Sequence, residues 1–419
     1  MLRARLPNLA HLRVRHAAMG LGACHVRWRL RRPVWAVSLL AAAGGTAHAL
    51  VGLKRPACQP ARASTAVPRS AEGSASTPGP DLAEVASFSK AGPLYHKLRQ
   101  PPPATEWARH GSALAAQLAG DPAAGGLPPS ALDEALAARI YHLYLPIFFW
   151  ISAVIADARR ARASAGDAAR RAVAIGISAP QGCGKTTLVD LLVDRFAADG
   201  LTCVAVSVDD FYLTGAEQDQ VAAEHSENAL LQGRGHAGTH DLALGVDTLK
   251  ALCSTQEQTV AVPRYDKAAR GGRGDRAVRS AWGKARTPCD VVLLEGWMAG
   301  FKPRGDPPAL SAIHPGLPDV DAALGAYQAW DELMDGWCVI ALQDKQHVFE
   351  WRLQAEKAMA AAGRPGMSNE GVRAFVARYM PAYEAYCPSL YAAAAGAGVD
   401  GKPTLLLRVD GRRAPVAEA

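Results

Sequence analysis

The residues best suited to chemistry lie in a short loop with two glycines, a lysine and two threonines. Such a loop, placed before a helix, turns backbone N–H groups toward phosphate oxygens, and the helix N-terminus adds partial positive charge. Here Lys185 would reach the outer phosphates, and the hydroxyl of Thr186 would ligate Mg²⁺. Ala179 replaces the first glycine of the G-x-x-x-x-G-K-T/S pattern. We expect ATP and Mg²⁺ to bind here, with the nucleotide site formed by Ala179, Pro180, Gln181, Gly182, Cys183, Gly184, Lys185, Thr186 and Thr187.

Acidic residues follow two predicted strands downstream of this loop. Asp209 and Asp210 come after the β-branched run 202–208, and Glu295 comes near the end of 290–297. A carboxylate at the carboxyl end of a parallel strand can orient and deprotonate an acceptor hydroxyl, although a single Asp there can also cap a turn. We predict Asp209 and Lys185 as catalytic residues, Asp210 as a substrate contact, and Glu295 with Thr186 as the Mg²⁺ ligands.

Basic side chains are concentrated in two later segments. A glycine-rich, cationic loop spans 260–279, and its Arg264, Tyr265, Arg273 and Arg276 are candidates to bind an anionic acceptor, because arginine matches a carboxylate bidentately. A solvated basic loop is the alternative. In the helix expected from 348, Arg352 and Lys357 belong either to a lid or to a solvated face.

Two histidines between these segments have a spacing that also occurs in metal sites. His236 and His240 are four residues apart, but three glycines nearby disfavour a helix before Thr239. We therefore favour a loop that ends in a helix N-cap at Thr239 or Asp241 over a metal site.

The elements that position these residues alternate between strands and helices. This order predicts an α/β fold of the P-loop NTPase type, with a doubly wound, mainly parallel sheet and helices on both faces. The expected strands are 173–177, 202–208, 290–295, 337–342 and 404–409, with a further short strand at the start of 260–279.

The first part of the chain has a different composition. Residues 1–71 contain twelve Lys and Arg and no acid, which predicts an organelle transit peptide and a low-complexity linker over 1–79. The apolar run 34–53 leaves a membrane anchor, the signal half of a bipartite leader or a disordered tail as alternatives. We expect a helical extension over 80–165, with a kink or end at Pro146, and a kinase domain over 166–419.

The charge and the cysteines exclude some classes of protein. The net charge is +7, so the chain without residues 1–71 carries about −5 and has no basic footprint for nucleic acid. The eight cysteines lack framework spacing, which favours reduced thiols, and Cys183 is read as a small tolerated residue rather than a redox switch. We expect no stable membrane span in the mature protein. The sequence leaves the oligomeric state open.

The motifs together resemble one family. Gly-Cys-Gly-Lys-Thr-Thr, Val-Asp-Asp-Phe-Tyr, Pro-Arg-Tyr-Asp-Lys, Leu-Leu-Glu-Gly-Trp and Arg-Leu-Gln-Ala-Glu-Lys, in this order, are similar to the plant and fungal type of D-glycerate 3-kinase. That family resembles the phosphoribulokinase, uridine kinase and pantothenate kinase group, and the resemblance covers 145–409.

The resemblance implies ATP-dependent phosphorylation of D-glycerate to 3-phosphoglycerate, the closing step of photorespiration in the chloroplast. It implies Asp209 as the base and Tyr265, with Arg264, beside the acceptor. A mitochondrial location is the alternative. The competing functions are a kinase for another small acceptor, of the uridine- or pantothenate-kinase kind, and a nucleotide-binding regulator without turnover.

Overall fold

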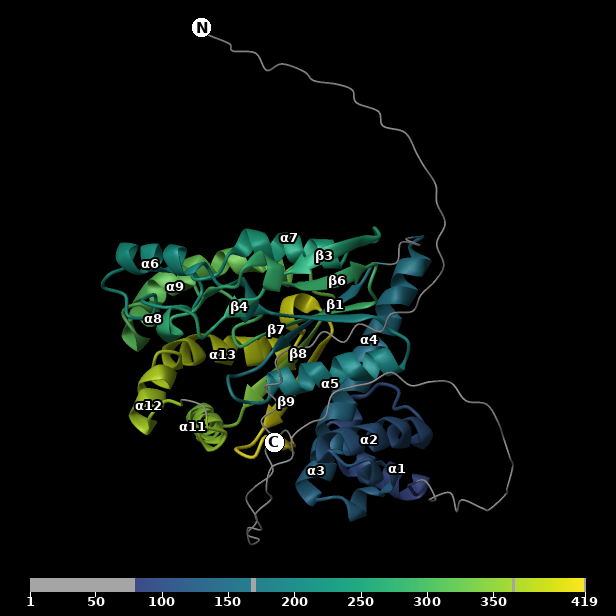
Figure 1. Ribbon diagram of the computed structural model, residues 1–419. Coiled ribbons are helices and arrows are strands. Elements are labelled where there is room, and N and C mark those ends of the chain that lie inside the picture. Colours follow the sequence, from purple (N-terminus) through teal and green to yellow (C-terminus); the bar gives the residue numbers. More distant parts are fainter. Residues whose placement is uncertain (1–79, 167–170, 364–365, 418–419) are drawn as a thin grey trace, which may run out of the picture. The chain divides into compact units, whose positions relative to one another are not determined.

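A computed structural model describes residues 80–166, 171–363 and 366–417. The expected transit peptide, and the run 34–53 within it, lie outside these residues. The chain from Val173 onward alternates strands and helices around one sheet (Figure 1). Two short antiparallel ribbons lie outside that sheet, in the segment between its second and third strands along the chain.

The main sheet has six strands in the order β10-β9-β8-β1-β7-β2. Five strands run parallel, and only the short edge strand β10 is antiparallel. Every residue of β1, β7 and β8 is buried, as expected for parallel strands covered on both faces. The bounds are β1 Val173–Ser178, β2 Cys203–Ser207, β7 Val291–Gly296, β8 Gly336–Leu342, β9 Thr404–Val409 and β10 Pro415–Val416.

The sheet is doubly wound, as the sequence predicts. The crossover from β1 to β2 contains α5 and moves one way along the sheet, whereas the crossover from β8 to β9 contains α11, α12 and α13 and moves the other way. Right-handed crossovers in opposite directions place their helices on opposite faces. The bounds are α5 Lys185–Ala198, α11 Gln346–Ala361, α12 Asn369–Ala377 and α13 Met380–Ala395.

The segment between β2 and β7 contributes two helices and two antiparallel ribbons outside the main sheet. Its ribbons pair β3 with β6 and β4 with β5. None of β4, β5 and β6 was expected from the sequence. The bounds are α6 Gly215–Glu224, α7 Leu242–Leu252, β3 Gln258–Val262, β4 Tyr265–Asp266, β5 Asp275–Arg276 and β6 Gly283–Thr287. Between β7 and β8 lie α8 Pro307–Ile313, α9 Leu317–Leu324 and α10 Gln328–Asp331.

The region before β1 is helical, as expected. It contains α1 Leu82–Ala91, α2 Ala104–Ala119, α3 Glu134–Ala138, a π-helical segment η4 Arg139–Tyr144 and α4 Leu145–Ser164. Ion pairs fix α4 to the starts of two strands, Arg159 to Asp290 at 2.5 Å and Arg162 to Asp335 at 2.7 Å.

The helix does not end at Pro146, which was one of the two outcomes expected there. The helix continues from Glu134 to Ser164, because the wide π turn before the proline, in which Leu145 N–H bonds to the carbonyl of Ile140, accommodates its missing donor. By length and composition this helix could cross a bilayer, and it is the only such helix among the described residues. However, 67% of its most apolar window is buried against the rest of the chain, as in the core helix of a folded domain.

Candidate active site

The phosphate loop connects the end of β1 to the start of α5. Two of its residues have positive φ, Gly182 at 82° and Gly184 at 96°, a conformation that glycine adopts without strain. The N–H of Ala179 donates to the carbonyl of Gly296 at the end of β7, at 3.1 Å. This bond fixes the start of the loop to the neighbouring strand end.

The tip of the loop is held by residues from the C-terminal part of the chain. A Cβ on Gly182 would lie 2.7 Å from the Cβ of Trp351 on α11, so only glycine fits there. Arg413 donates through Nε to the carbonyl of Gly182 at 2.8 Å, and its guanidinium lies 5.0 Å from the centre of the Trp351 ring. Neither residue belongs to a motif that points to this role.

The functional side chains of the loop are accessible. Lys185 Nζ donates to the carbonyl of Pro180 at 3.0 Å, and Thr186 and Thr187 are exposed at the first turn of α5. The N–H of Gln181 donates to the hydroxyl of Tyr383 at 3.0 Å. Burial raises the pKa of the Cys183 thiol, so at neutral pH this group is protonated and unreactive.

The strand order brings Glu295 beside the phosphate loop. In β7 this residue pairs in register with Ile177 of β1 and with Ser207 of β2. Its side chain is only 9% exposed, and burial raises its pKa although the charge of Lys185 opposes the rise. A buried carboxylate of this kind is stabilised in its ionised form by a nearby cation.

Asp209 lies where β2 ends, in the 3₁₀ turn Val208–Phe211. Burial would raise its pKa, but the Lys267 ammonium and a hydrogen bond from the Tyr212 hydroxyl hold the pKa well below its usual range. Tyr212 donates to Oδ1 at 2.8 Å, and Lys267 donates to Oδ2. The charge of Lys185 in the phosphate loop also lowers the pKa of Asp209, so the carboxylate is an anion at neutral pH.

Asp210 has a structural task. Its carboxylate accepts from Arg264 at 2.8 Å and from the N–H of Tyr265 at 3.3 Å, which ties the β4–β5 ribbon to the end of β2. The ring of Tyr265 contacts that of Tyr212 edge to face, with centroids 5.2 Å apart. Of the predicted acceptor residues, Tyr265 therefore packs against Tyr212, which donates to Asp209. Arg264 instead forms an ion pair with Asp210.

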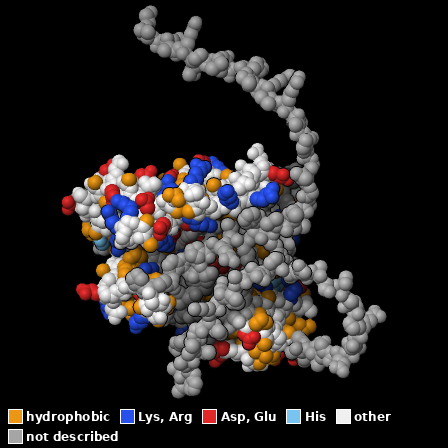
Figure 2. All heavy atoms as spheres, in the orientation of Figure 1, with side chains coloured by type: hydrophobic (Ala, Val, Ile, Leu, Met, Phe, Trp, Pro, Cys, Tyr) orange, Lys and Arg blue, Asp and Glu red, His pale blue; other side chains and the backbone are white. Residues whose placement is uncertain are grey.

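Three of the remaining predicted cations pair with different carboxylates. Arg276 pairs with Asp241 at 3.0 Å, and Arg273, 59% exposed, pairs with Asp219 on α6. Figure 2 shows Lys and Arg side chains with acidic side chains among them on the surface near α6. On α11, Arg352 pairs with Glu356 at 2.5 Å, while Lys357 is exposed.

Both histidines are held by hydrogen bonds, and His240 also packs on Tyr212, which donates to Asp209. Nδ1 of His240 bonds to the Tyr327 hydroxyl at 2.7 Å, and its ring stacks on Tyr212 with centroids 4.5 Å apart. His236 bonds through Nε2 to the carbonyl of Arg378 at 2.9 Å. Asp241, one of the two expected caps, begins α7 by accepting from the N–H of Leu244 at 3.0 Å.

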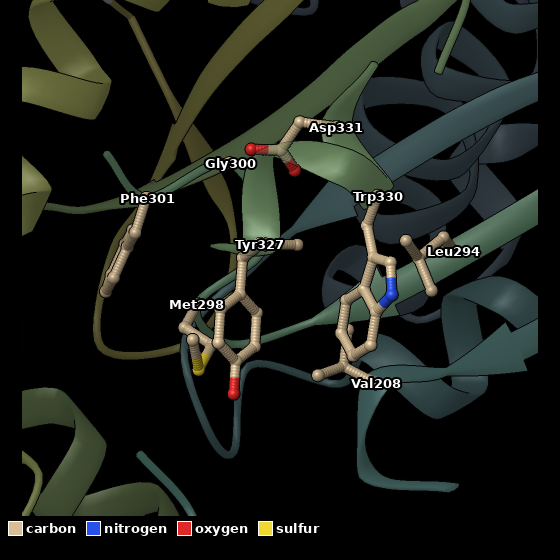
Figure 3. A pocket seen from close by; sticks show the side chains of 9 residues that line it. Val208, Leu294, Met298, Gly300, Phe301, Tyr327, Trp330 and Asp331 are labelled. Carbon is tan, nitrogen blue, oxygen red and sulfur yellow. The ribbon is translucent and has the colours of Figure 1, made fainter. Parts of the chain in front are cut away.

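A small apolar pocket underlies this network (Figure 3). Tyr327 and Trp330 lie side by side in it, and Val208 and Leu294, which immediately precede Asp209 and Glu295, point toward it. Its one acidic residue, Asp331, accepts from Lys302 at 2.9 Å. The pocket is therefore a packed support behind the acidic residues rather than a phosphate site.

Two cations near Asp209 were not among the predicted site residues. Lys267 ends the Pro-Arg-Tyr-Asp-Lys motif, so a signal for it was present. Arg234, in the glycine-rich segment before His236, bonds to the carbonyls of Gly272 at 3.0 Å and Lys267 at 3.4 Å. Its role depends on the folding of two distant loops, so local sequence carries little signal for it.

The oxygen donors at this site suit Mg²⁺. Glu295 supplies a buried carboxylate, and Thr186 supplies a hydroxyl at the helix N-terminus. Among the described residues no three His, Cys, Asp or Glu side chains gather as a metal site. Mg²⁺ does not require such a cluster, since it is commonly held by one or two carboxylates together with substrate phosphates and water.

Comparisons with known proteins agree with this geometry. The model of the phosphoribulokinase/uridine kinase family matches residues 174–306. The chloroplastic D-glycerate 3-kinase of Arabidopsis thaliana is 46% identical over 284 residues, which are 67% of this chain and 61% of that protein. An uncharacterized kinase of Schizosaccharomyces pombe is 39% identical over 225 residues, 52% of this chain and 81% of the relative.

A solved structure gives the same result. The D-glycerate 3-kinase of Cryptococcus neoformans superposes with a TM-score of 0.57 at 30% identity, and the match covers 65% of this chain and 97% of that one. The match covers most of the Schizosaccharomyces kinase and nearly all of the Cryptococcus enzyme, so this chain belongs to the D-glycerate 3-kinase family of P-loop kinases.

Proposed function

We propose that this protein is an ATP-dependent kinase that phosphorylates the 3-hydroxyl group of D-glycerate. The observation that carries the proposal is the convergence of the phosphate loop, Glu295 and Asp209 at adjacent strand ends. The names of the Arabidopsis and Cryptococcus relatives support D-glycerate as the acceptor.

In the proposed reaction the acceptor oxygen attacks the γ-phosphorus of ATP in line. The new O–P bond forms as the bond from the γ-phosphorus to the β,γ-bridging oxygen breaks, and the hydroxyl proton passes to Asp209. Such transition states are loose, so a carboxylate with a low pKa still serves by orienting the hydroxyl and accepting its proton late.

The other roles follow from position. Loop amides and Lys185 bind the phosphates, and Lys185 exchanges its bond to the carbonyl of Pro180 for a phosphate oxygen. Thr186 and Glu295 would hold Mg²⁺, which neutralises phosphate charge when bound. Tyr265 and Asp210 shape the acceptor side, with Arg264 as the partner of Asp210.

We also propose lid and leader functions. Helix α11 would close over the nucleotide, with Lys357 exposed to meet phosphate and Arg352 released from Glu356 on closure. Residues 1–79 would direct the chain to the chloroplast for photorespiration, with the mitochondrion as the alternative. The helical extension would span 80–165 and the kinase domain 166–419.

A panel of acceptors tests the proposal. We would couple ADP release to NADH oxidation with D-glycerate, L-glycerate, uridine and pantothenate, and locate the phosphate on the product by NMR. We expect turnover with D-glycerate and phosphate on its third carbon. Turnover of uridine or pantothenate but not D-glycerate would refute the assignment, and ATP binding without any turnover would favour a regulator.

A further inference from the structure

The cations around the acceptor side differ in which carboxylate of the protein they pair with. Most cations of the segment 264–276 have a carboxylate partner that is not predicted to act in catalysis. These pairs join Arg264 to Asp210, Arg276 to Asp241, and both Arg270 and Arg273 to Asp219. A substrate carboxylate that bound to one of them would have to replace an existing ion pair and leave a second carboxylate without its partner.

Lys267 is the exception, because its partner is Asp209 itself. Its side chain is 59% exposed and that of Asp209 is 29% exposed, so the pair is in contact with solvent. Lys267 is the more exposed partner, and a lysine ammonium on a flexible stem can move to another anion. Nevertheless, while Lys267 donates to Oδ2 and Tyr212 donates to Oδ1, Asp209 is a weaker base toward an incoming hydroxyl.

Arg234 supplies a second positive charge beside Lys267. Backbone carbonyls of the glycine-rich loop, including those of Gly272 and Lys267, hold its guanidinium, which lies 5.5 Å from the centre of the Tyr265 ring. Within the described part of the chain no carboxylate forms an ion pair with Arg234. Its charge is therefore fixed in place and available to an anion.

We propose that Lys267 and Arg234 bind the carboxylate of the acceptor, and that Lys267 releases Asp209 as it does so. This inference rests on the proposed function. In a three-carbon hydroxy acid, a hydroxyl placed on Asp209 leaves the carboxylate within reach of the lysine that previously held Asp209. The acceptor thus replaces both interactions of the ion pair, supplying a hydroxyl to Asp209 and an anion to Lys267.

This change of partner by Lys267 favours acidic acceptors in two ways. Their carboxylate is attracted to the lysine, and it also removes the lysine from Asp209. A neutral analogue offers the hydroxyl but no anion, so Lys267 stays on Asp209 and keeps the carboxylate a weak base. Binding energy at a non-reacting group is then used to prepare the reacting one. Removal of Lys267 should therefore harm the acidic substrate and relieve the neutral one.

The test compares D-glycerate with D-glyceramide, its neutral amide, in full-length wild-type protein and in Lys267→Gln. We expect kcat/KM for D-glycerate to fall roughly 10- to 100-fold, mainly through KM, because a charge-assisted contact is lost. The rate with D-glyceramide should stay constant or rise. The matched control is Lys284→Gln, an exposed lysine on β6, which should leave both rates unchanged.

Arg234 is tested by Arg234→Lys and Arg234→Gln with thermal unfolding measured alongside, since this side chain also braces its loop. A restored preference for D-glycerate in the lysine variant over the glutamine variant supports a charge role. An unchanged ratio of D-glycerate to D-glyceramide in Lys267→Gln, even with both rates reduced, overturns the proposal.

The rates of the wild-type protein distinguish a failure of this inference from a failure of the proposed function. If wild type ignores D-glycerate but phosphorylates another hydroxy acid, the proposed substrate is wrong, and the exchange is measured on that acid and its amide. If wild type turns over only neutral acceptors, the exchange is refuted together with the function.

Discussion

The hydroxyl of Tyr212 donates to Oδ1 of Asp209 at 2.8 Å while the ring of Tyr212 stacks on His240. The aromatic ring is buried, and His240 is in turn bonded to the hydroxyl of Tyr327. One carboxylate oxygen is thus fixed by a packed network, and the other accepts from Lys267, whose side chain is 59% exposed. Asp209 is therefore rigid on one side and exchangeable on the other.

Removal of this hydroxyl should slow the reaction without unfolding the protein. In Tyr212→Phe the ring still stacks on His240, but Asp209 loses a bond to a charged acceptor, worth about 1.5–3 kcal/mol. We expect kcat to fall roughly 10-fold or more, with the melting temperature little changed. Steady-state kinetics would show this, with Tyr95→Phe in the helical extension as control. A kcat equal to that of wild type would mean that Tyr212 does not orient Asp209.

Arg413 should affect the binding of ATP but not the binding of the acceptor. It holds the carbonyl of Gly182 at the tip of the phosphate loop and lies over Trp351. Arg413→Gln should raise KM for ATP by roughly 10-fold, the loss expected for one hydrogen bond to a charged group, while KM for D-glycerate stays constant. The exposed neighbour Arg412 provides the control, Arg412→Gln. A larger effect on D-glycerate than on ATP would contradict the assigned position.

Stability should fall as the pH is lowered from about 6.5 toward 4. Burial lowers the pKa of His236 to about 4 and that of His240 to about 3, so the folded protein keeps both rings neutral. Below the unfolded pKa of about 6.5 the unfolded chain takes up these protons first, and each ring lowers the unfolding free energy by up to about 1.4 kcal/mol per pH unit. Above that pH their contribution is complete.

Urea unfolding at pH 7 and pH 5 measures this effect. His236→Gln keeps a group that can bond to the carbonyl of Arg378 but cannot titrate. The difference in unfolding free energy between the two pH values should therefore be smaller in the variant than in wild type. An equal difference would show that His236 is not held neutral in the folded state.

The sequence was sufficient to predict the site residues that lie next to the strands and helices that position them. The strand, loop and helix around Lys185, and the acids that follow β2 and β7, are adjacent in sequence to the elements that place them. Parallel pairing then brings Glu295 beside Ile177, as the strand pattern predicts.

Contacts between distant segments could not be predicted in the same way. Arg413 reaches Gly182 across 231 positions, and Arg234 braces a loop 38 positions away. Arg273 and Arg276 resemble acceptor ligands in sequence, yet their partners Asp219 and Asp241 become visible only in the fold. The continuation of the helix past Pro146 depends on the π turn before it, which has no simple sequence signature.

The most direct test of the account is the rate of Asp209→Asn with saturating ATP and D-glycerate. Asparagine keeps the shape and can still meet Tyr212, but it cannot accept the hydroxyl proton. We predict a fall in kcat of roughly 10²- to 10⁴-fold, the usual contribution of a general base, with ATP affinity retained. Asp266→Asn, an exposed aspartate on β4, should behave as wild type. A kcat for Asp209→Asn within a few-fold of wild type would contradict the account.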